Sequence, residues 1–343
     1  MKRQVFLDKS NSDISPPSSL ETLIEVKNLS KQFDTVKALD GIGFDVFQGE
    51  LFGFLGPNGA GKTTTINILT GLARPDAGEI RIGGLDCSKN PKVAQHLIGI
   101  VPDESNLYPE LTGFQNLDFC ASLYGITRQE RQKRAQDLLE SFDLRESAHR
   151  KYASYSKGMK RKLTIAAGII HRPEILFLDE PTTGIDVASA RQIRRLIAEL
   201  HRAGTTIFLT THYIEEAERL CERIAFIVKG KIVRIDSIQN LLQPVQERKA
   251  MLISFLNGGI DLCGQLAATF PDYEFQSISN EQVRVESDDI LSLGPLVRFI
   301  EKQGSQVTEA RRLKPSLEEV FIRVTGIELN NMRTEKEKRK TGQ

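Results

Sequence analysis

The chain of 343 residues has no tryptophan, only four cysteines and no long apolar run. Its densest apolar stretches, such as Ile175-Leu176-Phe177-Leu178, are short and bounded by charge, whereas a helix that spans a bilayer needs about 18 apolar residues. Residues 1–20 also lack the apolar centre of a signal peptide. We therefore expect a protein that does not enter the membrane itself, so that any connection to a membrane comes through another chain.

The cysteines and the charge balance argue against two further classes of protein. The cysteines are too far apart in sequence to form a CxxC pair, which favours buried thiols in a reducing compartment over a disulfide framework or a metal site. They are Cys87, Cys120, Cys221 and Cys263. The 46 lysines and arginines are matched by 45 acidic residues, so the formal net charge is +1. Nothing in this balance favours nucleic acid as a partner, and none is expected.

Residue patterns divide the chain into two domains between two tails. Residues 1–22 are expected to form a disordered leader, and the charged residues 327–343 a disordered tail. Over residues 23–243, strand-like and helical patterns alternate, as in an α/β domain with a parallel sheet. Short strands predicted at 24–26, 44–47 and 79–82 indicate an antiparallel β subdomain, and residues from about 104 to 170 indicate a helical subdomain.

The second domain is expected at residues 244–326, after a linker at Gln243-Pro244. Its predicted segments are 251–255, 261–270, 273–278, 282–286, 291–303, 306–311 and a last helix opening at Ser316. Glu319 follows Ser316 by three residues, which indicates a capping box. Ser279-Asn280-Glu281 indicates a hairpin connection. The order strand-helix-strand-strand-helix-strand-helix predicts a small α+β sandwich.

The clearest chemical motif is Gly56-Pro57-Asn58-Gly59-Ala60-Gly61-Lys62-Thr63-Thr64, which contains the full pattern G-x-x-x-x-G-K-S/T. It lies between an apolar run of strand length and a helical pattern, as this motif requires. Glycines let successive backbone N–H groups point at phosphate oxygens. Lys62 is expected to neutralise the β- and γ-phosphates, and the hydroxyl of Thr63 to bind Mg²⁺. These residues predict a phosphate-binding loop that takes ATP with Mg²⁺.

Two carboxylates, Asp179 and Glu180, end the apolar strand predicted at 175–178. Ligands of open α/β sheets bind at the carboxyl edge of the strands, so we expect both side chains to lie near the phosphate loop. Asp179 is predicted to hold Mg²⁺, directly or through water. Glu180 is predicted to position or deprotonate the water that attacks the γ-phosphate.

A third motif, Tyr155-Ser156-Lys157-Gly158-Met159, opens a helical pattern, and its Gly158 lies 21 residues before Asp179. It resembles the signature of ABC transporter ATPases, usually written LSGGQ, and the resemblance covers about residues 23–326. Lys157 replaces a glycine and Met159 a glutamine. The resemblance implies a P-loop NTPase of the ABC ATPase type, in which two copies pair head to tail. Ser156 and Gly158 would then contact the γ-phosphate bound by the other copy.

Further elements of the ABC pattern follow in order. Phe33 occupies the place where an aromatic ring stacks on adenine in similar proteins, although an edge-strand core residue is an open alternative. Thr183-Gly184-Ile185-Asp186 resembles the D-loop that communicates across the dimer. His212 follows the strand predicted at 208–211 and matches the switch histidine that contacts the γ-phosphate. The resemblance therefore implies that Phe33, Asp186 and His212 belong to the nucleotide site.

One position departs from the family pattern. Relatives most often carry glutamine where this chain has Asp103, and that glutamine touches Mg²⁺ and the water and relays the nucleotide state to the membrane partner. A carboxylate oxygen is a good ligand for Mg²⁺. It also adds negative charge near the γ-phosphate. Asp103 is accordingly expected to act as a catalytic and metal-binding residue.

Other stretches resemble the ATPases of drug, antibiotic, sodium or polysaccharide exporters, namely the signature variant, Thr63-Thr64-Thr65, residues 108–112 and residues 315–321. This implies a cytoplasmic protein, peripheral on the inner face of the cell membrane, that docks as a homodimer on separate transmembrane permease subunits. An importer ATPase stays possible, although such subunits more often end in small β-barrels. A non-transport ATPase of ribosomes or DNA also stays possible, although the chain has one phosphate loop and only 94 residues from Lys62 to Ser156.

Overall fold

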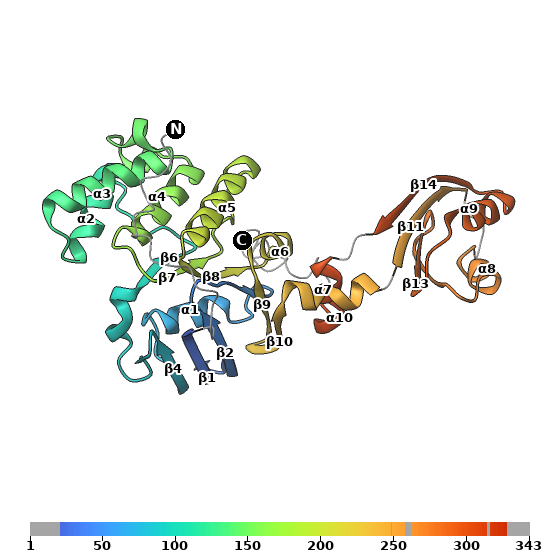
Figure 1. Cartoon of the computed structure of the whole chain (residues 1–343), viewed down its shortest axis with the longest axis horizontal. Coiled ribbons are helices and arrows are strands. Elements are labelled where there is room, and N and C mark those ends of the chain that lie inside the picture. Colours follow the sequence, from blue (N-terminus) through green and yellow to red (C-terminus); the bar gives the residue numbers. More distant parts are fainter. Residues whose placement is uncertain (1–20, 248, 258–261, 314–315, 328–343) are drawn as a thin grey trace, which may run out of the picture. The chain divides into compact units, whose positions relative to one another are not determined.

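The computed structural model describes residues 21–247, 249–257, 262–313 and 316–327 (Figure 1). The predicted leader and tail therefore lie almost wholly outside the described residues. Contacts divide the chain into two units, of which the second runs from Ile238 to Gly326 and the first comprises the chain up to Ser237 together with Ile327. No helix in the described part is long and apolar enough to cross a membrane.

The boundary between the units differs from the predicted linker. Gln243 and Pro244 lie inside helix α7 (Ile238–Glu247) instead of between domains. Ile238, Leu241 and Leu242 recur at helical spacing, and Leu241 is buried. This apolar periodicity outweighs the breaking signal of the proline, because the helix packs against α10 (Leu317–Thr325).

A six-stranded sheet forms the centre of the first unit, in the order β10-β9-β3-β8-β7-β6. Its strands are β3 (Leu51–Leu55), β6 (Ile98–Val101), β7 (Ile175–Asp179), β8 (Thr206–Thr211), β9 (Arg223–Val228) and β10 (Lys231–Ser237). All neighbours pair in parallel except β9 with β10. Every residue of β3, β7 and β8 is buried, as expected for parallel strands that are covered on both faces.

The predicted antiparallel subdomain is a separate sheet in the order β2-β1-β4-β5. Its strands are β1 (Thr22–Phe33), β2 (Val36–Phe47), β4 (Ala77–Ile82) and β5 (Leu85–Asp86). The antiparallel pairing is confirmed. The strands β1 and β2 are longer than expected, because they form one hairpin of two 12-residue strands.

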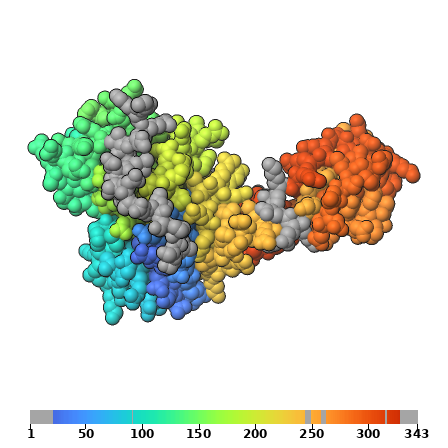
Figure 2. Space-filling model, viewed as in Figure 1, coloured from blue at the N-terminus to red at the C-terminus, as the bar shows by residue number. Residues whose placement is uncertain are grey.

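Helices of the first unit are α1 (Lys62–Leu69), α2 (Gly113–Leu123), α3 (Arg128–Ser141), α4 (Lys157–Ile169), α5 (Val187–Arg202) and α6 (Ile214–Leu220). Short 3-10 turns cover Pro91–Leu97, Arg145–Ser147 and Tyr152–Ser154. Helices α2, α3 and α4 pack together in the region predicted to be a helical subdomain. On the surface, this helical segment (green) and the antiparallel sheet (blue to cyan) occupy separate areas of the first unit (Figure 2).

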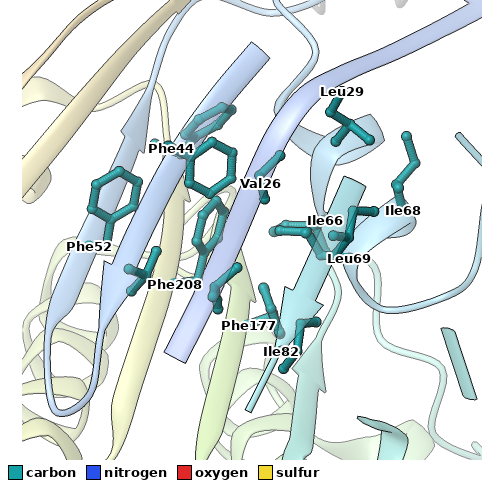
Figure 3. Packing of buried hydrophobic residues seen from close by; sticks show 14 of the residues in the cluster. Val26, Leu29, Phe44, Phe52, Ile66, Ile68, Leu69, Ile82, Phe177 and Phe208 are labelled. Carbon is teal, nitrogen blue, oxygen red and sulfur yellow. The ribbon is translucent and has the colours of Figure 1, made fainter. Parts of the chain in front are cut away.

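An aromatic cluster joins the two sheets of the first unit (Figure 3). Phe44 of β2 lies with its ring centroid 5.7 Å from Phe52, 5.5 Å from Phe54 and 5.8 Å from Phe208. Phe208 in turn lies 5.4 Å from Phe177 of β7. Such spacings are typical of favourable aromatic pairs. The strands that precede the predicted site residues are therefore anchored by one shared core.

The second unit contains an antiparallel sheet in the order β12-β13-β11-β14. Its elements after α7 are β11 (Lys249–Leu256), α8 (Leu262–Thr269), β12 (Glu274–Ser279), β13 (Gln282–Ser287), α9 (Leu293–Lys302), β14 (Gln306–Leu313) and α10. This is the predicted order, and β12 and β13 form the predicted hairpin. Apolar residues of α8 and α9 pack on one face of the sheet, so the second unit has its own core.

The capping box predicted at Ser316 is only half formed. The hydroxyl of Ser316 accepts a hydrogen bond from the backbone N–H of Glu319 at 3.4 Å. The carboxylate of Glu319 makes an ion pair with Arg284 of β13 instead of returning to Ser316. The ion pair with Arg284, which is distant in the sequence, therefore takes the place of the local hydrogen bond that a full capping box requires.

We expect Phe208→Ala to lower the free energy of unfolding by about 3–5 kcal/mol, because the ring is wholly buried among four other phenylalanines. Urea unfolding followed by circular dichroism measures this change. Phe208→Leu keeps much of the apolar volume and should cost less than half as much. Equal losses in the two variants would show that the ring contacts do not matter.

Candidate active site

The topology brings the predicted site residues to one edge of the central sheet. Strands β6, β7, β8 and β3 are neighbours and parallel, so their carboxyl ends meet. Asp103 follows β6, Asp179 ends β7 with Glu180 after it, His212 follows β8, and Gly56 follows β3. Each strand of the four therefore delivers at least one candidate residue.

Close approach of the backbone requires glycine at both ends of the predicted phosphate loop. A Cβ atom at Gly56 would lie 2.1 Å from the carbonyl oxygen of Ile227 in β9. At Gly61, where φ is +107°, it would lie 2.7 Å from the carbonyl oxygen of Ala38. Neither position tolerates a side chain without movement of the backbone. The loop is thus seated tightly on its neighbours, and α1 begins directly after it.

Lys62 is buried at the start of α1 and points back into the loop. Its ammonium Nζ donates hydrogen bonds to the carbonyl oxygens of Gly56 at 2.8 Å and Pro57 at 3.0 Å. Nζ also lies 3.4 Å from Oε1 of Glu180. A buried ammonium requires such partners. The contact joins the loop after β3 to the carboxylate after β7.

Glu180 is held from several sides in an uncommon backbone conformation. Its φ is +46°, in the left-handed region that non-glycine residues rarely adopt. The backbone N–H donates to the carbonyl oxygen of Thr210 at 3.0 Å. The hydroxyl of Thr183 donates to Oε2 at 3.0 Å, and Nδ1 of His212 lies 3.0 Å from the same oxygen. The side chain of Glu180 therefore lies between Lys62 and His212.

Asp179 is buried beside the first turn of α1. Burial raises the pKa of its carboxyl group, and hydrogen bonds with Thr210 and Thr63 oppose that effect. A bound divalent cation would favour the carboxylate form. No group of three metal-ligating side chains occurs among the described residues. Mg²⁺ usually takes only one or two protein ligands and completes its shell with phosphates and water, so Thr63 and Asp179 fit this metal.

Asp103 lies in the loop after β6 and is partly exposed. Arg161 of α4 holds this loop through hydrogen bonds to the carbonyl oxygens of Pro102 at 2.6 Å and Asp103 at 2.7 Å. Its Nη2 lies 3.7 Å from Oδ1 of Asp103. Burial lowers the pKa of Arg161, and the neighbouring charge of Asp103 opposes that effect. The loop is therefore fixed mainly through its main chain.

The residues predicted to act across a dimer lie at the starts of two helices, where Ser156 and Asp186 are exposed and Gly158 is buried. Ser156 is the N-cap of α4, where its hydroxyl accepts from the N–H of Met159 at 3.2 Å. Asp186 is the N-cap of α5 and accepts from the N–H of Ser189 at 2.9 Å. A Cβ at Gly158 would lie 2.3 Å from Oγ of Ser189, so the two helix starts pack closely. The described contacts of Ser156 and Asp186 do not include the phosphate loop.

Phe33 lies at the end of β1 with half of its surface exposed. The ammonium of Lys31 lies 5.2 Å from its ring centroid. This exposure does not fit a core residue of an edge strand, the alternative considered for Phe33. It leaves the ring available for stacking.

Three residues that form hydrogen bonds with the predicted site residues were not themselves predicted to be site residues. Thr210 bonds both Asp179 and the N–H of Glu180, Thr183 bonds the carboxylate of Glu180, and Arg161 holds the loop of Asp103. The only signal for Thr210 was its place at the end of an apolar strand. Arg161 belongs to a basic stretch that looks like a solvated helix face.

Comparison with known proteins shows which family the chain resembles. Residues 39–183 match the family described as "ABC transporter". The chain is 34% identical to the daunorubicin resistance ATP-binding protein DrrA2 of Streptomyces coeruleorubidus over 90% of this chain and 96% of that protein. It is 35% identical to the Nod factor export ATP-binding protein I of Paraburkholderia xenovorans, over 91% of this chain and 99% of that protein. It is 42% identical to the linearmycin resistance ATP-binding protein LnrL of Bacillus subtilis, over 64% of this chain and 70% of that protein.

Solved structures of ATP-binding cassettes match about two thirds of the chain. An ATP-binding subunit of an ABC transporter superposes with a TM-score of 0.59 at 31% identity, covering 65% of this chain and 93% of that one. A second structure is the ATP-binding cassette MJ0796 in a dimeric post-hydrolysis state bound to ADP and Pi. Its TM-score is 0.59 at 27% identity, covering 63% of this chain and 98% of that one.

We expect Thr210→Val, which replaces the hydroxyl with a methyl group of similar size, to slow ATP hydrolysis about tenfold and to destabilise the fold by about 1–3 kcal/mol. The variant leaves Asp179 without one hydrogen-bond donor and Glu180 with one bond fewer. Steady-state ATPase assays and urea unfolding measure the two effects. Thr210→Ser keeps the hydroxyl and is the matched control. A hydrolysis rate equal to that of the wild type in Thr210→Val would contradict a positioning role.

Proposed function

Since the chain belongs to the ATP-binding proteins of the ABC transporter family, we propose that its ATPase activity drives export through separate transmembrane permease subunits. The observation that carries the proposal is the placement of Glu180. This carboxylate lies 3.4 Å from the ammonium of Lys62 and 3.0 Å from the ring of His212, at the carboxyl end of a buried parallel strand. The proposal includes the roles of the predicted site residues in binding and hydrolysing ATP.

Hydrolysis follows from these positions. The loop N–H groups and the start of α1 would bind the phosphates, and Lys62 would exchange its carbonyl contacts for phosphate oxygens. Thr63 and Asp179 would hold Mg²⁺, which supplies positive charge to the β- and γ-phosphates. Glu180 accepts a proton from the attacking water as its oxygen bonds to the γ-phosphorus. The bond from that phosphorus to the bridging oxygen breaks, and ADP leaves with the electron pair.

His212 and Asp103 have supporting roles in this scheme. His212 would donate to the γ-phosphate, and its ring lies beside Glu180, with Nδ1 3.0 Å from a carboxylate oxygen. Asp103 would approach the metal and the water from the loop after β6 and report the nucleotide state to the permease. Phe33 would stack on the adenine ring, for which its exposed face is suited.

A head-to-tail homodimer would complete each site. Ser156 and Gly158 lie at the start of α4, where the helix N-terminus favours negative charge, and Ser156 is exposed. The exposed Asp186 caps the start of α5, whose Ser189 lies against Gly158, and would contact the partner copy. The dimeric state of the similar cassette MJ0796 supports this assembly.

Export is favoured over import by the relatives and by the second unit. The similar proteins are named for resistance to linearmycin or daunorubicin and for Nod factor export. The second unit is an open four-stranded sheet with helices, not a small barrel. We propose that the protein acts at the cytoplasmic face of the membrane and that its cargo is an antibiotic-like compound or a secreted oligosaccharide.

Glu180→Gln should bind ATP with Mg²⁺ but hydrolyse it at least a hundredfold more slowly, since the amide cannot accept the proton. The variant should accumulate as an ATP-bound dimer that size-exclusion chromatography detects. Thr63→Ala, which removes the proposed metal ligand, serves as a control that should not form this dimer. A Glu180→Gln variant that stays monomeric with ATP and hydrolyses it normally would overturn the proposal.

Asp103→Gln restores the residue usual in the family and should leave ATP binding intact while shifting the hydrolysis rate severalfold. The reason is that the substitution removes negative charge near the γ-phosphate without removing an oxygen ligand. Isothermal titration with ATP and steady-state assays separate the two quantities. Loss of nucleotide binding in Asp103→Gln would contradict the placement of Asp103 at the metal.

A further inference from the structure

Arg161 joins three parts of the first unit that otherwise come from distant segments. It lies on α4, five residues after the N-cap Ser156. Its guanidinium donates to the carbonyl oxygens of Pro102 at 2.6 Å and Asp103 at 2.7 Å, and to that of Glu180 at 3.5 Å. One side chain therefore contacts the loop after β6, the turn after β7 and the helix that starts with the signature segment.

These contacts are specific to Arg161 and not to any cation on α4. Lys162 is buried to a similar degree on the same helix, but its ammonium lies 3.9 Å from Asp143 at the end of α3. Burying a guanidinium costs free energy unless its donors are satisfied. The donors of Arg161 point to main-chain oxygens of the two site loops. A planar fork of five donors suits this arrangement, whereas an ammonium offers fewer directions.

A second connection fixes the same loop to α4. The hydroxyl of Ser105 accepts a hydrogen bond from the Tyr152 hydroxyl at 2.6 Å and lies at hydrogen-bond distance, 2.9 Å, from the Thr164 hydroxyl. Thr164 lies one turn of α4 after Arg161, so the two residues share a helix face. The loop from Pro102 to Ser105 is thus bound to α4 at two points and should move with it.

We propose that Arg161 is a positioning residue that couples the ATP site of one copy to its own signature segment, and thereby to the site of the partner copy. When ATP binding shifts the Asp103 loop or the Glu180 turn, the three hydrogen bonds from Arg161 to carbonyl oxygens pass this shift to α4. The helix is continuous from Lys157 to Ile169, so its start at Ser156 moves with Arg161. This inference rests on the proposed head-to-tail dimer.

The test uses the full chain carrying Glu180→Gln, in which dimer formation can be followed without hydrolysis. Arg161→Gln in this background should leave ATP binding by the monomer within about twofold and weaken ATP-dependent dimerisation about tenfold. Arg161→Lys, which keeps the charge, should recover part of the loss. Lys162→Gln is the matched control, because it removes an equally buried cation of the same helix, and it should change neither quantity. Isothermal titration and analytical ultracentrifugation measure binding and dimerisation.

The outcomes separate this inference from the proposed function. If Glu180→Gln alone fails to dimerise with ATP, the proposed clamp is wrong. If Glu180→Gln dimerises and Arg161→Gln dimerises equally well, the coupling role is wrong. Equal losses in Arg161→Gln and Lys162→Gln would show a general effect on the helical segment and would also overturn it. Should Arg161→Gln not fold, Ser105→Ala with Thr164→Val breaks the second connection and is expected to weaken dimerisation in the same direction.

Discussion

The parallel pairing of β7 with β8, and of β8 with β3, is the constraint on which the candidate active site depends. In this register Asp179 lies opposite Thr210 and Leu55 opposite Thr211. The three strands therefore end at the same level, and Lys62, Glu180 and His212 meet although they are far apart in the sequence. A slip of one residue would turn the side chains of a strand to its other face and would separate Asp179 from the hydroxyl of Thr210.

The same strands also carry the apolar core that supports this charged edge. Phe52 and Phe54 lie on β3, Phe177 on β7 and Phe208 on β8. Phe52, Phe54 and Phe208 pack around Phe44 of the antiparallel sheet, Phe177 packs on Phe208, and all are buried (Figure 3). Buried ionisable groups cost free energy even when paired, and the left-handed backbone of Glu180 adds strain. The aromatic core at these strands offsets that cost and holds the strand ends in register.

Residues with a fixed spacing to a strand could be predicted from the sequence, and residues that act through a neighbouring strand could not. The phosphate loop and the pair Asp179-Glu180 were found because a strand of predictable length precedes each. Thr210 bonds residues of β7 from β8, so its role depends on a strand order that the sequence does not state. Predictions from local sequence failed for a related reason at two positions. The linker predicted at Pro244 is part of a helix that packs against α10, and Glu319 pairs with Arg284 instead of completing the capping box. The α/β alternation of the first unit followed from residue patterns and its ABC type from the motifs, whereas the element order of the second unit followed from periodicity together with turn and cap signals.

Arg161 also explains how the chain accommodates a carboxylate where glutamine is usual. Its two short hydrogen bonds go to main-chain oxygens of Pro102 and Asp103, so the position of the loop does not depend on the side chain at 103. The guanidinium lies 3.7 Å from Oδ1 of Asp103 and partly offsets the added negative charge. The carboxylate at position 103 therefore adds negative charge to a loop whose main chain is held by Arg161.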